Sequence, residues 1–135
     1  MMSALLALAA LASTPSAIPV DAGRANWSDF PALARVERSL PTLGMVEEVE
    51  TMLRDGQCRI AGQRPTNFDI TVPYLVLVQP DGSAARIVVA DMGCPDLEAY
   101  VGSIVTALSQ AGDFRPTGQQ RARWYASNIN FNLDD

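Results

Sequence analysis

Histidine and lysine are both absent from this chain of 135 residues. Without histidine, the chain cannot build a Ser-His-Asp or Cys-His nucleophile from its own residues. The commonest protein ligand of zinc, copper and nickel is missing too, and two cysteines do not complete a zinc site. The sequence therefore predicts a protein that is not an enzyme and has no catalytic residues, no cofactor and no metal.

Positive charge is also scarce, since 10 basic residues, all arginine, stand against 15 acidic ones. The arginines form no basic stripe, and nucleic-acid binding therefore has little electrostatic support. Hydrophobic residues make up 48% of the chain. Such a chain has the length and the apolar content for one folded domain.

No apolar run approaches the ~20 residues that a membrane-spanning helix needs. Residues 4–12 are apolar and uncharged, and small residues follow them, as in a secretory signal. We expect a signal peptide over 1–17, a linker over 18–26, and an exported domain over 27–135 with no stable membrane span. The first residues carry no lysine or arginine, so an uncleaved anchor or a misassigned start codon remains an alternative.

The expected export bears on the two cysteines of the chain, Cys58 and Cys94. In an oxidising compartment two cysteines usually pair. A bridge between them would stabilise the fold by about 3.8 kcal/mol in the chain-entropy model. Two buried free thiols are the alternative.

Hydrophobic periodicity predicts an α+β domain with the order helix, helix, strand, strand, helix, strand. Apolar residues at helical spacing predict helices over 29–40, 45–53 and 95–111. Pro31 and Pro95 suit first turns, and Gly56 and Gly112 suit helix ends. Two β-like runs, 68–79 and 86–91, flank a Pro-Asp-Gly-Ser turn and predict a hairpin.

The last expected strand, 121–133, alternates between apolar and polar residues. One face carries Tyr125, Ile129, Phe131 and Leu133, and the other carries Trp124, Asn128, Asn130 and Asn132. A period of two with one polar face predicts a strand with one side near solvent.

Residues 74–133 resemble the C-terminal domain of TonB-type energy transducers. The resemblance lies in a series of motifs in a fixed order: Tyr74-Leu75-Val76-Leu77-Val78, an Asp81-Gly82 turn, Ile87-Val88-Val89, a helix over 97–108, Phe114-Arg115-Pro116-Thr117-Gly118 and Ile129-Asn130-Phe131-Asn132-Leu133. This chain shows neither the membrane anchor nor the long proline-rich spacer of a full transducer. We therefore expect a free-standing TonB-like module.

The resemblance implies a small three-stranded antiparallel sheet packed against helices, and a periplasmic location. It also implies that the closing strand, here 123–132, can add an extended peptide to the sheet, for example a segment of an outer-membrane receptor. The expected partner-binding residues are Arg123, Trp124, Asn128, Asn130 and Asn132. Tryptophan and asparagine suit such an interface. An ordinary solvated strand face is the alternative.

Three functional hypotheses follow from these observations. The first is a non-catalytic periplasmic module that binds a protein or an extended peptide by strand addition. The second is a disulfide-stabilised structural or inhibitor-like envelope protein. The third is an enzyme or redox protein that uses Cys58 or Cys94, which requires a thiolate with a lowered pKa.

Overall fold

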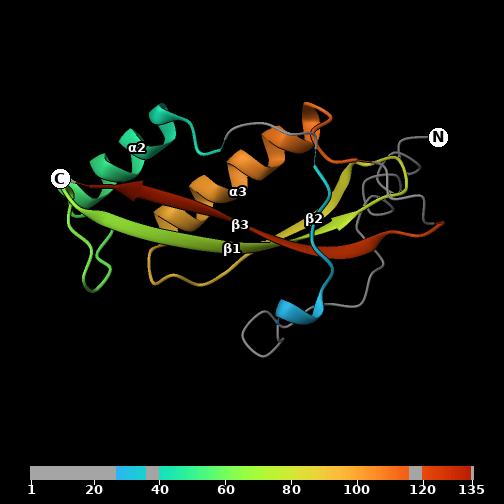
Figure 1. The fold of residues 1–135 in the computed structure, drawn as a ribbon, viewed down its shortest axis with the longest axis horizontal. Helices are drawn as coiled ribbons and strands as arrows, with labels where there is room; N and C mark the ends of the chain where they lie inside the picture. Colours follow the sequence, from blue (N-terminus) through green and yellow to red (C-terminus); the bar gives the residue numbers. More distant parts are fainter. Residues whose placement is uncertain (1–26, 36–39, 116–119, 135) are drawn as a thin grey trace, which may run out of the picture.

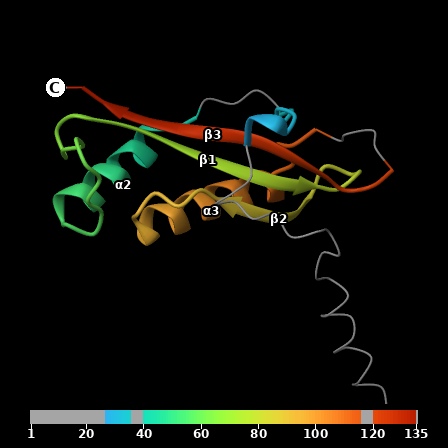
Figure 2. The ribbon, with the colours of Figure 1, turned by 90° about the horizontal axis from the view of Figure 1, so that it is seen from below.

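A computed structural model of the protein describes residues 27–35, 40–115 and 120–134. The expected signal peptide and linker lie outside the described residues. The elements are η1 (Trp27–Asp29), α2 (Leu43–Arg54), β1 (Phe68–Val78), β2 (Ala84–Val89), α3 (Pro95–Gln110) and β3 (Arg123–Leu133). The strands form an antiparallel sheet in the order β2-β1-β3, and both α-helices lie on one face of it (Figures 1 and 2). The expected α+β class and antiparallel sheet are confirmed.

The central strand β1 carries the core because every second side chain points toward the helices. The buried side chains on this face are Phe68, Ile70, Val72, Tyr74, Val76 and Val78. The pairing of β1 with β3 runs without a register shift from Phe68↔Leu133 to Val78↔Arg123. The alternation expected for β3 is confirmed, since Ile129 and Phe131 are buried whereas its asparagines are exposed.

Helix α3 ends in a way that turns the chain inward. The backbone N–H of Gly112 donates to Ser109 O at 3.1 Å, and that of Asp113 donates to Leu108 O at 2.9 Å. This pair of bonds requires a residue in the left-handed conformation directly after the helix. Gly112 is that residue, with a φ of 75°. As a result Asp113 and Phe114 are buried directly after the helix.

A disulfide between Cys58 and Cys94 joins the turn after α2 to the start of α3, with the two Cα atoms 5.3 Å apart. The expected bridge is confirmed, and the alternative of two free thiols is wrong. The bridge holds α2 beside α3, where Val49, Met52 and Leu53 of α2 join the common core.

The helix expected over 29–40 is wrong for the described residues. A three-residue 3-10 turn, η1, is followed by an extended stretch, residues 31–35, which we call the strap. Pro31 disfavours the helical conformation in the residue before it. The peptide groups of the strap instead bond to β3 and to the loop after α3. Its apolar member, Leu33, packs against the core from this extended conformation.

Candidate functional site: the outer edge of β3

The outer side of β3 is an edge of the sheet, and the strap crosses it at Ala126. The N–H of Ala126 donates to Pro31 O at 2.9 Å, and Ala126 O accepts from the N–H of Leu33 at 3.0 Å. Both peptide groups of Ala126 therefore point away from β1. The chain thus already adds one short extended segment to this edge.

Beyond Ala126 the edge is open in the described part of the chain. In an unbroken strand the outward peptide groups recur at every second residue, so those of Asn128, Asn130 and Asn132 point outward as well. No backbone group within 27–35, 40–115 or 120–134 bonds to them from outside the sheet. The stretch available for strand addition is therefore shorter than the expected 123–132, because the strap occupies its middle.

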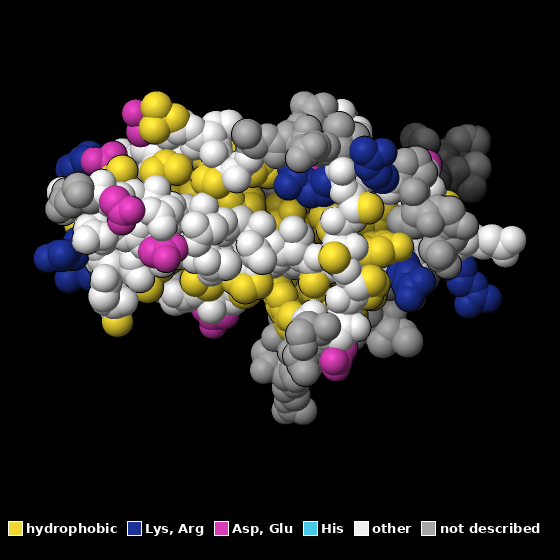
Figure 3. All heavy atoms as spheres, in the orientation of Figure 1, with side chains coloured by type: hydrophobic (Ala, Val, Ile, Leu, Met, Phe, Trp, Pro, Cys, Tyr) yellow, Lys and Arg dark blue, Asp and Glu magenta, His cyan; other side chains and the backbone are white. Residues whose placement is uncertain are grey.

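The asparagine side chains of this stretch are exposed on the face of the sheet away from the helices. Asn130 Nδ2 donates to Asp69 Oδ1 and to Thr71 Oγ1 of β1, both at 2.7 Å. These bonds orient the Asn130 amide across the sheet rather than toward the edge. In Figure 3 this half of the face shows acidic side chains and few apolar ones, whereas apolar side chains gather nearer the crossing of the strap.

Arg123 and Trp124 lie on the other side of Ala126. Arg123 is exposed at the first position of β3, and Trp124 is half-buried opposite Leu77. The structure thus brings the three asparagines together in one row. It separates them from Arg123 and Trp124 by the crossing of the strap.

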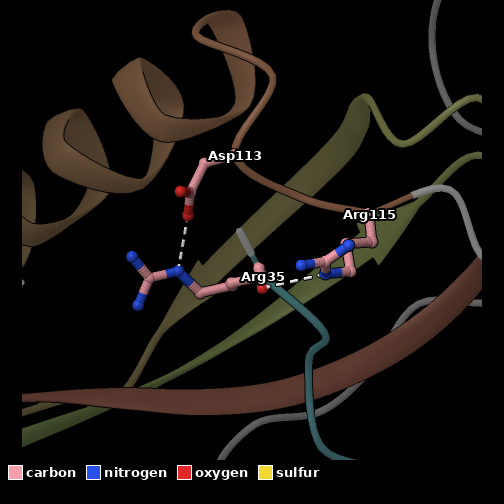
Figure 4. A network of polar contacts seen from close by, with 3 residues as sticks. All are labelled: Arg35, Asp113 and Arg115. Atoms are coloured by element: carbon pink, nitrogen blue, oxygen red, sulfur yellow. Dashed lines mark hydrogen bonds and ion pairs between the residues drawn. The ribbon is translucent and has the colours of Figure 1, made fainter. Parts of the chain in front are cut away.

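The contacts that hold the strap were not among the features expected from the sequence. Arg35 reaches the fully buried Asp113, with 2.5 Å between Nε and Oδ2 (Figure 4). In the same place Arg115 Nε donates to Arg35 O at 3.2 Å, and the N–H of Arg115 donates to Ala34 O at 3.0 Å. The strap is therefore held at one end by β3 and at the other by the loop after α3.

Tyr74 of β1 belongs to the same buried polar region. Desolvation raises the pKa of Tyr74, while Ser127 and the charge of Arg35 oppose the rise and the charge of Asp113 adds to it. Ser127 is the cross-strand partner of Tyr74, but its contact with the phenolic oxygen does not meet the geometry of a full hydrogen bond. The Nη2 atom of Arg35 is likewise buried without a hydrogen bond.

One sequence signal does point to this region. Gly112 marks the end of α3, and a carboxylate directly after such a helix end is carried inward if the chain turns back on the helix. For Arg35 no signal exists, because its partner lies 78 positions away.

The described residues contain no group of three or more His, Cys, Asp or Glu side chains placed to hold a metal ion. Within the same residues, no helix has the length and apolar character to cross a membrane. Searches against models of known families, curated proteins and solved structures found no match.

Proposed function

We propose that this chain is an exported, periplasmic protein-interaction module of TonB-like type, without catalytic activity. Its partner is a protein or an extended peptide that adds a short strand to β3 beside Asn128, Asn130 and Asn132. The observation that supports this best is the outward direction of the peptide groups at these three positions, next to an edge position that already holds an extended segment.

Two further features favour a partner strand here. Unpaired peptide groups on an edge strand are a template for another chain, and each hydrogen bond formed there contributes roughly 0.5–1.5 kcal/mol. Apolar side chains are also visible between β3 and α2 in Figure 3, and Met45 and Val46 of α2 are only partly buried. An added strand would place alternate side chains toward this apolar surface, which provides a basis for specificity.

The test separates backbone recognition from side-chain recognition at Asn130. A photo-reactive residue at position 128 would be used to capture partners from a cell-envelope extract. Both variants lose the two side-chain bonds from Asn130 to Asp69 and Thr71. Asn130→Pro also removes one outward N–H without removing a backbone bond to β1, whereas Asn130→Thr keeps that N–H. Thermal unfolding checks that both variants fold.

Strand addition predicts that Asn130→Pro abolishes the cross-link while Asn130→Thr retains it. A photo-reactive residue at Ser103, which is exposed on α3, provides the background. Equal capture by the proline and threonine variants would refute strand addition and favour the disulfide-stabilised structural or inhibitor-like protein.

A further inference from the structure

We propose that the groups that hold the strap form a recognition site for an extended partner segment carrying an apolar residue and, two positions later, an arginine. In this structure the chain's own Leu33 and Arg35 fill that site. A partner segment of the same pattern competes with the strap. The inference rests on the proposed function, since it concerns the occupied part of the same edge.

Most of the contacts to the strap involve its backbone. Ala126 offers one donor and one acceptor, and Arg115 donates from both its N–H and its Nε. The acceptors on the strap are the carbonyl groups of residues 31, 34 and 35. Any extended segment in this position would make the same four hydrogen bonds, because none of them depends on a strap side chain.

The two side chains that do contribute define the pattern. Leu33 is half-buried against the core, and Arg35 pairs with Asp113, which has no solvent exposure. A competing segment without a cation would not make the charge-assisted hydrogen bond that Arg35 makes to this buried carboxylate, which is unfavourable. Arginine fits better than lysine because its planar guanidinium is less strongly hydrated and bonds to Asp113 through Nε.

In a competition with a free segment the strap has the advantage, because it belongs to the same chain as its site. A short tether gives an effective concentration on the order of millimolar. A free peptide with only the same contacts is therefore expected to leave the wild-type protein unoccupied. A natural partner has to bring additional contacts, and the test must first weaken the strap.

The test uses the full chain with Leu33→Pro and Arg35→Ala, which together remove one backbone donor and the ion pair. The probe is a synthetic peptide of residues 27–37 with the native sequence. A second peptide carries Arg35→Ala and a third Arg35→Lys. Binding is measured by isothermal titration calorimetry, and far-UV circular dichroism with thermal unfolding verifies that the double variant is folded.

We expect the native peptide to bind the double variant saturably and the wild-type protein not at all. The Arg35→Ala peptide should bind about tenfold more weakly or worse, because a charge-assisted hydrogen bond is lost. The Arg35→Lys peptide should lie between them. Absence of saturable binding to the folded variant, or equal affinity of the native and alanine peptides, would overturn the inference.

If the double variant does not fold, the single variant Leu33→Pro, which keeps the ion pair, replaces it in the comparison of peptides. The expected ratio of affinities between the native and the Arg35→Ala peptide is the same, and the same two results would overturn the inference. The outcome is separable from that of the proposed function. Asn130→Pro lies outside the strap contacts and should leave peptide binding unchanged. If the native peptide does not bind but Asn130→Pro loses partner capture, this inference is refuted while the proposed function stands.

Discussion

Arg35 and Asp113 lie 78 positions apart in the sequence, yet Arg35 Nε donates to Asp113 Oδ2 at 2.5 Å. The pair joins the strap, which crosses the edge of β3, to the loop that follows α3. Proteins commonly shield exposed strand edges by covering them. Here the cover is partial, since it reaches Ala126 and leaves the row Asn128, Asn130 and Asn132 open in the described residues.

The Arg35–Asp113 pair should be important for stability. Arg35→Ala removes a charge-assisted hydrogen bond to a fully buried carboxylate and is expected to lower the free energy of unfolding by about 3 kcal/mol. The matched control is Arg54→Ala, because the Arg54–Glu50 pair is also 2.5 Å long but its arginine is 56% exposed. That variant should cost less than about 0.5 kcal/mol. Urea unfolding of both variants measures the difference.

A further control separates the loss of the pair from the cost of burying the carboxylate. The double variant Arg35→Met/Asp113→Leu carries neither charge of the pair, so it should be more stable than Arg35→Ala alone. If Arg35→Ala costs no more than Arg54→Ala, the buried pair does not hold the strap as described.

The hydroxyl of Tyr74 is expected to contribute little at neutral pH. It is buried without a full hydrogen bond, so Tyr74→Phe should change the free energy of unfolding by less than about 1 kcal/mol in either direction. A loss of several kcal/mol in urea unfolding would indicate that the hydroxyl is fully hydrogen-bonded.

Alkaline pH should reveal the raised pKa of Tyr74. Above about pH 10 the unfolded chain loses the tyrosine proton while the folded protein keeps it, so stability falls as the pH rises toward the folded pKa. Tyr74→Phe should reduce this decline. Some decline should remain, because desolvation and the charge of Glu48 also raise the pKa of Tyr100. Identical pH profiles for wild type and variant between pH 9 and about pH 11 would contradict the raised pKa.

The disulfide should stabilise the fold without being needed for recognition. Replacement of Cys58 and Cys94 by alanine is expected to lower the free energy of unfolding by about 2–4 kcal/mol. A reducing agent should destabilise the wild-type protein and leave the double variant unchanged. Loss of partner capture by a folded double variant would favour the third hypothesis, in which the cysteines themselves act.

Local sequence rules gave most of the elements but not the strap. The three strands and the helices α2 and α3 were predictable because their apolar periodicity, turn residues and capping glycines agree. The helix expected over 29–40 is wrong for the described residues because Leu33 packs against the core in an extended conformation rather than on a helix face. Only the tertiary partners, Ala126 and the loop after α3, reveal why the strap is extended.

The candidate site was also only partly predictable. Alternation along β3 identified the exposed face with its asparagines, because the side-chain period of a strand is fixed. The alternation did not indicate which outward peptide groups of β3 lack a hydrogen-bond partner among the described residues. That depends on a strap from the other end of the domain and on the burial of Asp113, a long-range consequence of how α3 ends.

The most direct test of the open edge is amide hydrogen exchange of β3 in the free protein, measured residue by residue by NMR. The account predicts slow exchange at Ile129 and Phe131, which bond to β1, and at Ala126, which bonds to the strap. It predicts fast exchange at Asn128, Asn130 and Asn132. Uniform protection along the strand would show that the edge is already covered and would contradict its role in partner binding.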